Sequence, residues 1–159
     1  MTTNPPLTQQ SVRPATMNDV PVILSILENY VATGNLLPRS REEVEQRVRD
    51  FFVVGEPGIP IACGALEIFT AELAEVRSLM VAPGHLRQGL GSVLVQYVAE
   101  EAKQRGIARL MALTYAPEFF HNLGFRTVPK TSLPEKVWGV CVKCYKFNNC
   151  DEIAVLRPL

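Results

Sequence analysis

The chain has 159 residues, 47% of them hydrophobic, and its 16 basic and 16 acidic side chains give a formal net charge of zero. This composition predicts a soluble globular protein and argues against a nucleic-acid binder, which normally carries a basic excess. No apolar run is long enough to span a membrane and no signal-peptide pattern begins the chain, so we expect a cytoplasmic protein without membrane association.

The first ten residues are polar and proline-containing, which is typical of a flexible leader. The rest of the chain has no internal repeat and no linker-like segment, and its length suits one domain with a sizeable core. We therefore expect a leader at residues 1–10 and a single domain at residues 11–159.

The beginning of the domain predicts a short strand followed by two helices. Residues Thr16 to Asp19 offer helix caps, and apolar residues from Val20 to Tyr30 recur at helical spacing. Ser40 and Glu43 have the spacing of a capping box ahead of a strongly charged segment. The expected elements are a strand at 11–15, a helix that starts near Val20 and ends at Gly34 and Asn35, and a helix at 41–49.

The remainder of the domain predicts strands that alternate with helices. The expected elements are strands at 51–54, 59–69 and 72–81, a helix at 90–105, a strand at 109–114, a short helix at 117–123, a strand at 125–128 and a last strand at 151–156 that closes the sheet. This order predicts an α/β domain with a mixed central sheet flanked by helices.

A glycine-rich loop joins the strand at 72–81 to the helix at 90–105. The first N–H groups of a helix have no intrahelical partner and the helix dipole adds positive charge there, so this end attracts an anion. Gly89 and Gly91 allow close approach to the backbone, and Arg87 adds a full charge. The loop has neither the lysine of a nucleoside-triphosphate P-loop nor the dinucleotide fingerprint. It predicts a phosphate-binding site, with an ordinary strand-to-helix turn as the alternative.

Residues 86–91 read Leu-Arg-Gln-Gly-Leu-Gly and resemble the acetyl-CoA pyrophosphate loop of the GNAT superfamily of N-acetyltransferases, Q/R-x-x-G-x-G/A. Leu86 departs from this pattern, which matters little because the family's loop binds phosphate mainly through backbone amides. The resemblance implies the GNAT fold, acetyl-CoA as co-substrate, and a strand that offers the backbone of Leu79 and Val81 to the pantetheine arm. The implied acetyl-CoA-binding residues are Leu79, Met80, Val81, Leu86, Arg87, Gln88, Gly89, Leu90, Gly91 and Ser92.

Several further segments resemble the short, stand-alone bacterial N-acetylglutamate synthases. They are residues 36–40, 75–79, 112–115, 133–138, 141–144 and 147–152. With the loop, this similarity spans nearly the whole chain after Ser11. It implies acetyl transfer to the α-amine of L-glutamate, the first step of arginine biosynthesis, by direct attack in a ternary complex. A homodimer is left open. The competing interpretations are an acetyltransferase for another amine or a protein N-terminus, and a non-catalytic acyl-CoA-binding or sensor domain.

Glu75 is the candidate general base, because several GNAT enzymes carry a glutamate at this strand position. An amine must lose a proton before it attacks a thioester, so the site needs a base within reach. The alternative is a solvent-facing glutamate paired with Arg77. Strand alternation predicts two faces. One face carries Glu75, Arg77 and Leu79, and the other carries Val76, Ser78 and Met80.

The general acid is missing where the family often carries a tyrosine, because Phe120 occupies that place. Tyr115 and His121 are the nearby candidates, and each also has an ordinary structural explanation, as a packed strand-end residue and a solvated helix residue. A CoA thiol has a pKa near that of a free cysteine, so a dedicated acid is not a requirement. The predicted catalytic pair is Glu75 with Tyr115.

Recognition of glutamate requires convergent cations for two carboxylates, preferably arginines that bind in a bidentate manner. We expect Arg39, Arg77 and Lys136 to serve this purpose, with Ser40 as a hydroxyl donor. For each cation the alternative is an ordinary surface charge. A polyamine acceptor would instead favour an acidic pocket.

The four cysteines predict two different environments. Cys63 lies in an expected strand and is interpreted as a buried small hydrophobe. Cys141, Cys144 and Cys150 have a spacing that suits metal ligands but lack an evident fourth ligand. Zinc binding, a local disulfide and reduced structural thiols all stay open, and we expect reduced thiols without a bound metal.

Overall fold

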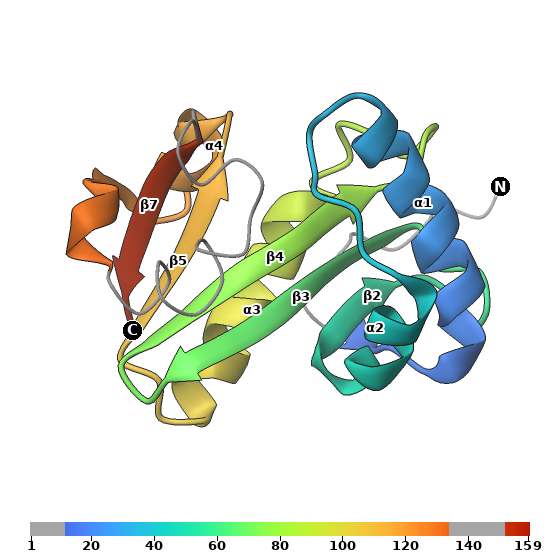
Figure 1. The fold of residues 1–159 in the computed structure, drawn as a ribbon, viewed down its shortest axis with the longest axis horizontal. Coiled ribbons are helices and arrows are strands. Elements are labelled where there is room, and N and C mark those ends of the chain that lie inside the picture. Colours follow the sequence, from blue (N-terminus) through green and yellow to red (C-terminus); the bar gives the residue numbers. More distant parts are fainter. Residues whose placement is uncertain (1–11, 134–151) are drawn as a thin grey trace, which may run out of the picture. The chain divides into compact units, whose positions relative to one another are not determined.

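The computed structural model describes residues 12–133 and 152–159 of the chain. These residues form four α-helices and seven strands (Figure 1). The helices are α1 (Val20–Ala32), α2 (Arg41–Gln46), α3 (Leu90–Gln104) and α4 (Pro117–His121), with 3₁₀ turns at Met17–Asp19, Val48–Asp50 and Lys130–Ser132. The strands are β1 (Val12–Pro14), β2 (Phe51–Val54), β3 (Ala62–Thr70), β4 (Leu73–Val81), β5 (Arg109–Thr114), β6 (Arg126–Val128) and β7 (Ile153–Pro158).

The seven strands form a mixed sheet in the order β1-β2-β3-β4-β5-β7-β6. β4 and β5 are parallel, whereas β1 with β2, β2 with β3, β5 with β7, and β6 with β7 pair antiparallel. A parallel pair needs a crossover, and α3 provides it between β4 and β5. The predicted α/β class with a mixed central sheet is confirmed.

The last strand corrects one expectation, because β7 does not close the sheet at its edge. It lies between β5 and β6 and pairs antiparallel with both. Ala154, Val155 and Leu156 are buried in succession, as is usual for a strand covered on both faces. The edge belongs to β6, a three-residue strand whose first two residues are exposed, and such short strands suit edges.

Several element boundaries also differ from the expected ones, most of all in the second helix and the third strand. The charged helix expected at 41–49 ends at Gln46 and continues as a 3₁₀ turn at Val48–Asp50. The strand expected at 59–69 begins only at Ala62, because Pro60 lacks an N–H donor and Gly58 has a left-handed backbone with φ of +84°.

The chain divides into two compact units, one with residues up to 65 and 78–98, the other with residues 66–77 and from 99 on. In the first unit, β2 is buried on both faces. Phe51 and Val53 belong to the apolar cluster that includes Ile23 of α1. Phe52 instead packs against Tyr97 of α3, with the two ring centroids 5.2 Å apart. β2 therefore carries packing on either side of the sheet in this unit.

The second unit has its own apolar cluster. Leu73 of β4, Met111 of β5, Ala154 and Leu156 of β7, and Leu133 are all buried and in contact. Helix α4 contacts β6 and β7. This cluster holds together the parallel pair β4 and β5 at the beginning of both strands.

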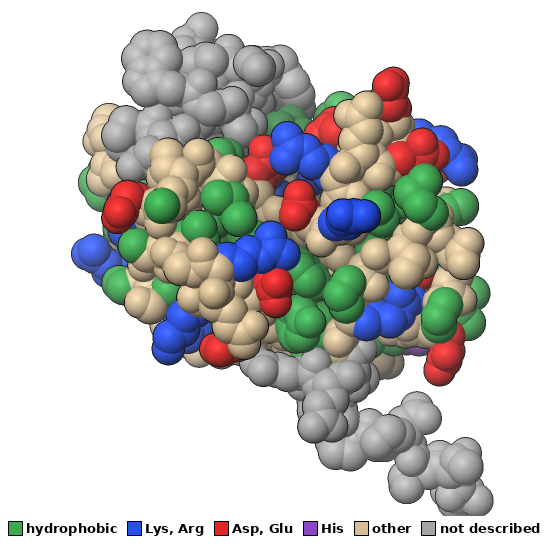
Figure 2. All heavy atoms as spheres, turned by 90° about the horizontal axis from the view of Figure 1, so that it is seen from below, with side chains coloured by type: hydrophobic (Ala, Val, Ile, Leu, Met, Phe, Trp, Pro, Cys, Tyr) green, Lys and Arg blue, Asp and Glu red, His purple; other side chains and the backbone are tan. Residues whose placement is uncertain are grey.

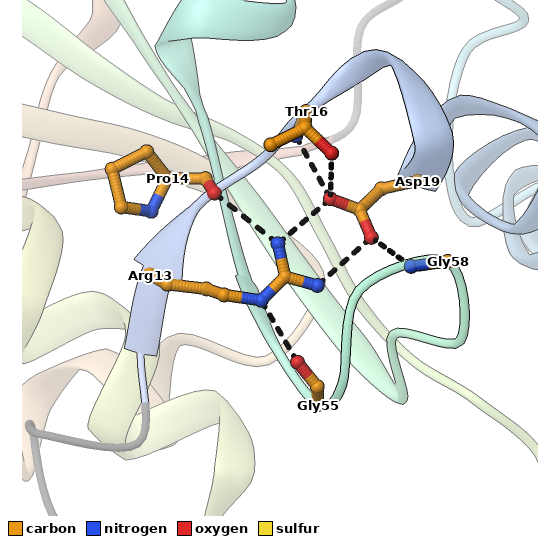
Figure 3. A network of polar contacts seen from close by, with 6 residues as sticks. All are labelled: Arg13, Pro14, Thr16, Asp19, Gly55 and Gly58. Atoms are coloured by element: carbon orange, nitrogen blue, oxygen red, sulfur yellow. Dashed lines mark hydrogen bonds and ion pairs between the residues drawn. The ribbon is translucent and has the colours of Figure 1, made fainter.

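An ion pair joins Arg13 of β1 to Asp19 of the 3₁₀ turn that follows this strand in the first unit (Figure 3). Two nitrogens of Arg13 donate to the two carboxylate oxygens of Asp19 at 2.8 Å each, and Arg13 Nε donates to the Gly55 carbonyl at 2.9 Å. The backbone N–H groups of Thr16 and Gly58 also donate to Asp19. The hydrogen bonds from Arg13, Thr16 and Gly58 hold the pKa of Asp19 well below its usual range, and the Asp19 carboxylate raises the pKa of Arg13.

Charged side chains of both signs are interspersed on the face of the molecule shown in Figure 2, in keeping with the balanced net charge. Within residues 12–133 and 152–159, no helix is both long and apolar enough to cross a membrane.

Candidate active site

The loop between β4 and α3 has the features of an anion-binding site. Leu86, Arg87, Gln88 and Gly89 are exposed, and the 15-residue helix α3 begins directly after them at the buried Leu90. The first N–H groups of a helix of this length are available to an anionic group.

The conformation of this loop depends on three left-handed residues, Gly84 with φ of 90°, Arg87 with φ of 63° and Gly89 with φ of 78°. A Cβ atom added to Gly89 would meet no heavy atom within 4 Å, so glycine is required there for its backbone conformation and not for lack of space. The backbone at Gly89, beside the start of α3, is therefore open to the approach of an anionic group.

The end of β4 is held by a hydroxyl group. The Tyr30 hydroxyl in α1 accepts a hydrogen bond from the Val81 N–H at 3.0 Å and donates one to the Val81 carbonyl at 3.2 Å. The resemblance to the GNAT family implies that the backbone of Val81 binds the pantetheine arm. An arm bound at Val81 would therefore have to displace the Tyr30 hydroxyl.

Ser78 interrupts the regular pleat of β4, because its φ of 53° is left-handed. The simple alternation of side chains expected across this strand does not hold at this point. A non-glycine residue in this conformation costs about 1–3 kcal/mol and persists only where its surroundings fix it. Arg39 Nη1 donates to Ser78 Oγ at 3.0 Å, and the Cys63 thiol lies 3.5 Å from the Ser78 carbonyl oxygen.

Arg39 is a nearly buried cation, with its side chain 5% exposed. Its Nε donates to Glu43 at 3.0 Å, and its guanidinium lies over the Phe51 ring at 5.2 Å from the centroid. The neighbouring Ser40 is exposed and caps α2 by accepting the Glu43 N–H, as the capping-box pattern predicts. Arg39 and Ser40 are therefore the predicted acceptor-binding residues that lie in the first unit.

Cys63 is fully buried, which confirms its interpretation as a small core residue. Burial raises the pKa of its thiol to about 12, although the nearby Arg39 charge opposes this shift. The thiol is therefore neutral and unsuited to nucleophilic chemistry.

In the second unit, the candidate base Glu75 belongs to a row of three charged residues. Glu75 is 2% exposed, so the solvent-facing alternative is wrong, although its carboxylate does lie 3.4 Å from Arg77 Nε. Arg77 Nη1 donates to Glu67 of β3 at 2.9 Å. Glu67 was not among the residues expected from the sequence, and its place on the strand adjoining β4 is the signal that could have identified it.

Of the residues considered for the general acid after β5, Tyr115 and His121 are exposed and Phe120 is buried. Tyr115, the predicted acid, follows β5 and is 44% exposed. Phe120 is buried, with its ring 5.0 Å from Phe119 and 5.2 Å from Phe125, so the position of the family's tyrosine is part of the packing here. His121 is exposed, and its Nε2 lies 2.8 Å from Thr127 Oγ1.

Lys136 and the cysteines Cys141, Cys144 and Cys150 lie outside the described residues. Within the part of the chain that the structure describes, no three histidine, cysteine, aspartate or glutamate side chains gather as metal ligands.

Comparison with known proteins agrees with this fold. A profile of the acetyltransferase (GNAT) family matches residues 25–125. An uncharacterized N-acetyltransferase of Chlorobaculum tepidum is 35% identical over 97% of this chain and 99% of its own length. An amino-acid acetyltransferase of Neisseria meningitidis is 35% identical over 94% of this chain but only 34% of its own length. The chain thus spans about a third of such amino-acid acetyltransferases.

Solved structures give the same result. The N-acetylglutamate synthase of Neisseria gonorrhoeae, complexed with coenzyme A and N-acetyl-glutamate, superposes with a TM-score of 0.83 at 32% identity, over 94% of this chain and 35% of that chain. Rv2747 of Mycobacterium tuberculosis, in complex with CoA, superposes with a TM-score of 0.81 at 27% identity, over 93% of this chain and 98% of that chain. The chain therefore belongs to the GNAT family and is an acetyltransferase with acetyl-CoA as its co-substrate.

Proposed function

We propose that the chain transfers the acetyl group of acetyl-CoA to the α-amine of L-glutamate, the first step of arginine biosynthesis. The buried carboxylate of Glu75 carries this proposal, because it is 2% exposed and lies on β4, the strand that leads into the acetyl-CoA loop. A carboxylate at this position is suited to take a proton from an incoming amine. Similarity to amino-acid acetyltransferases and to a synthase solved with N-acetyl-glutamate supports glutamate as the acceptor.

The proposed reaction is a direct attack in a ternary complex, without a covalent acetyl-enzyme. Glu75 takes one proton from the ammonium group of glutamate, directly or through one water molecule, and passes it to solvent. The nitrogen lone pair attacks the thioester carbonyl carbon, and the tetrahedral intermediate then collapses as its C–S bond breaks. The nitrogen's second proton ends on the departing CoA thiol, by way of Tyr115 or of solvent.

Arg39, Arg77 and Lys136, with the Ser40 hydroxyl, are proposed to bind the two carboxylates of glutamate. Guanidinium groups suit this purpose because their planar donors match a carboxylate in a bidentate manner. The side chains of Arg39 and Arg77 are 5% and 19% exposed, and a cation shielded from water attracts an anion more strongly than one on an open surface. A cytoplasmic location and a homodimer are part of the same proposal.

A thiol-release assay tests the acceptor. The protein is incubated with acetyl-CoA and, in turn, L-glutamate, L-glutamine, L-aspartate and polyamines, and mass spectrometry identifies the product. We expect N-acetylglutamate to form with the highest kcat/KM. A preference for polyamines would contradict the acceptor while leaving the acetyltransferase intact. Tight acetyl-CoA binding without release from any amine would instead favour a sensor domain.

A further inference from the structure

Glu67 is a charged residue of the second unit to which the proposed reaction gives no role. Its carboxylate oxygen lies 2.9 Å from Nη1 of Arg77, and the same guanidinium places its Nε 3.4 Å from the carboxylate of Glu75. The side chains of Glu67, Arg77 and Glu75 are 18%, 19% and 3% exposed. One arginine therefore lies between two carboxylates that are largely shielded from solvent.

The contact between Glu67 and Arg77 is the shorter of the two. A charge-assisted hydrogen bond at this distance is about twice as strong as a neutral one, so it restricts the long arginine side chain effectively. Glu67 also comes from a separate strand, because β3 and β4 are neighbours in the sheet and are joined by the two residues Ala71 and Glu72. A functional group supported from a rigid neighbouring element is held more accurately than one supported from a loop.

We propose that Glu67 is a positioning residue, which anchors the Arg77 guanidinium and thereby sets the position of Arg77 against the Glu75 carboxylate. The inference rests on the proposed function, in which Glu75 takes the proton of the amine and Arg77 contributes to acceptor binding. Glu67 touches neither substrate nor the reacting atoms in this scheme, and it acts only through Arg77. Without this anchor, Arg77 can move onto Glu75 alone and compete with the amine for the base.

A double-mutant cycle distinguishes this role from that of a structural ion pair. The variants Glu67→Ala, Arg77→Met and the double variant are compared with the natural protein in the thiol-release assay with glutamate. We expect Glu67→Ala to lower kcat/KM for glutamate about tenfold, the size of one charge-assisted hydrogen bond, and to leave the KM for acetyl-CoA within about twofold. The double variant is expected to be no slower than Arg77→Met alone.

The matched control is Glu72→Ala, which removes an exposed carboxylate from the same hairpin and is expected to keep full activity. Thermal denaturation of each variant reports folding. Glu67→Gln keeps the side-chain length and an acceptor oxygen but no charge, and it gives the same comparison if the alanine variant does not fold.

The possible results separate this inference from the proposed function. If Glu75→Gln is inactive while Glu67→Ala and Glu67→Gln are fully active, Glu67 has no positioning role and the proposed base stands. Losses that multiply in the double variant would show that Glu67 acts independently of Arg77, which also overturns the inference. Full activity of Glu75→Gln removes the base from the mechanism, and the role of Glu67 with it.

Discussion

Among single residues, Arg39 combines full charge with almost complete burial. Its contacts with Glu43, with Ser78 and with the face of Phe51 fix the guanidinium in one place. A side chain already held in this way loses little conformational entropy when it binds an anion. This is the physical reason to expect Arg39 to contribute to the affinity for glutamate.

Replacement of Arg39 by alanine tests that role. We expect the KM for glutamate to rise about tenfold or more, because a hydrogen bond to a charged group contributes about 1.5–3 kcal/mol. The KM for acetyl-CoA is expected to change far less. Steady-state kinetics with each substrate varied in turn measures both values. Arg41→Ala is the control, since Arg41 is exposed and pairs only locally with Glu45. Equal rises in the two KM values would remove Arg39 from acceptor binding.

Cys63 gives a second prediction for a single residue. Burial raises the pKa of its thiol to about 12, so almost no thiolate exists at pH 8. We expect iodoacetamide to leave Cys63 unmodified in the native protein and to alkylate it readily in urea, where a free cysteine has a pKa of about 8.5. Peptide mass spectrometry follows this site separately from the other cysteines. Rapid native alkylation of Cys63 would mean that its strand opens easily.

Among the elements, β4 carries the largest share of the candidate site. It contains Glu75, the left-handed Ser78 and the segment ending at Val81 that is proposed to bind acetyl-CoA. The Tyr30 hydroxyl forms two hydrogen bonds with the Val81 backbone, since it donates to the carbonyl oxygen and accepts from the N–H group. This hydroxyl therefore hydrogen-bonds to the polar groups that the pantetheine arm is proposed to use.

Tyr30→Phe is therefore expected to tighten acetyl-CoA binding by a few-fold. The arm no longer has to displace a hydroxyl from Val81, although the free protein loses about 1 kcal/mol of stability with its hydrogen bonds. Isothermal titration calorimetry with CoA measures the dissociation constant. Tyr97→Phe is the control, because this tyrosine packs its ring on Phe52 in the same unit. Weaker or unchanged binding in Tyr30→Phe would mean that the arm does not use Val81.

The sequence predicts most of these elements because hydrophobic periodicity and caps are local signals. For example, the spacing of Ser40 and Glu43 predicts the start of α2, and the Ser40 hydroxyl does cap that helix. The placement of β7 inside the sheet depends on pairing with β5 and β6, which periodicity does not report. The same limit applies to the site. The hydrogen-bonded residues Tyr30 and Val81 are 51 positions apart in the sequence, and Arg39 and Ser78 are 39 positions apart. Neither contact therefore has a local sequence signal.

For the molecule as a whole, acid stability depends on where its carboxylates lie. Charges of both signs are interspersed on the face in Figure 2, and exposed ion pairs contribute little to stability. The carboxylate of Asp19 is different because it is completely buried and accepts hydrogen bonds from Arg13, Thr16 and Gly58 (Figure 3). Its pKa lies well below the usual range, so in acid the unfolded chain takes up this proton before the folded one does.

The contribution of Asp19 is therefore complete above its unfolded pKa of about 3.9 and is lost as the pH falls towards the lower folded value. We expect Arg13→Met to reduce the free energy of unfolding by about 3 kcal/mol at pH 7, because it leaves a buried charge without its cation. This difference should shrink at pH 3, because without Arg13 the folded protein takes up a proton on the buried Asp19 more readily, whereas in the natural protein Arg13 keeps the pKa of Asp19 well below its usual range. Urea denaturation at both pH values measures it. Arg41→Met, which removes a cation that is 63% exposed, should change stability by less than about 0.5 kcal/mol. A loss for Arg13→Met as small as that of this control, or equal at both pH values, would mean that the buried pair does not govern acid stability.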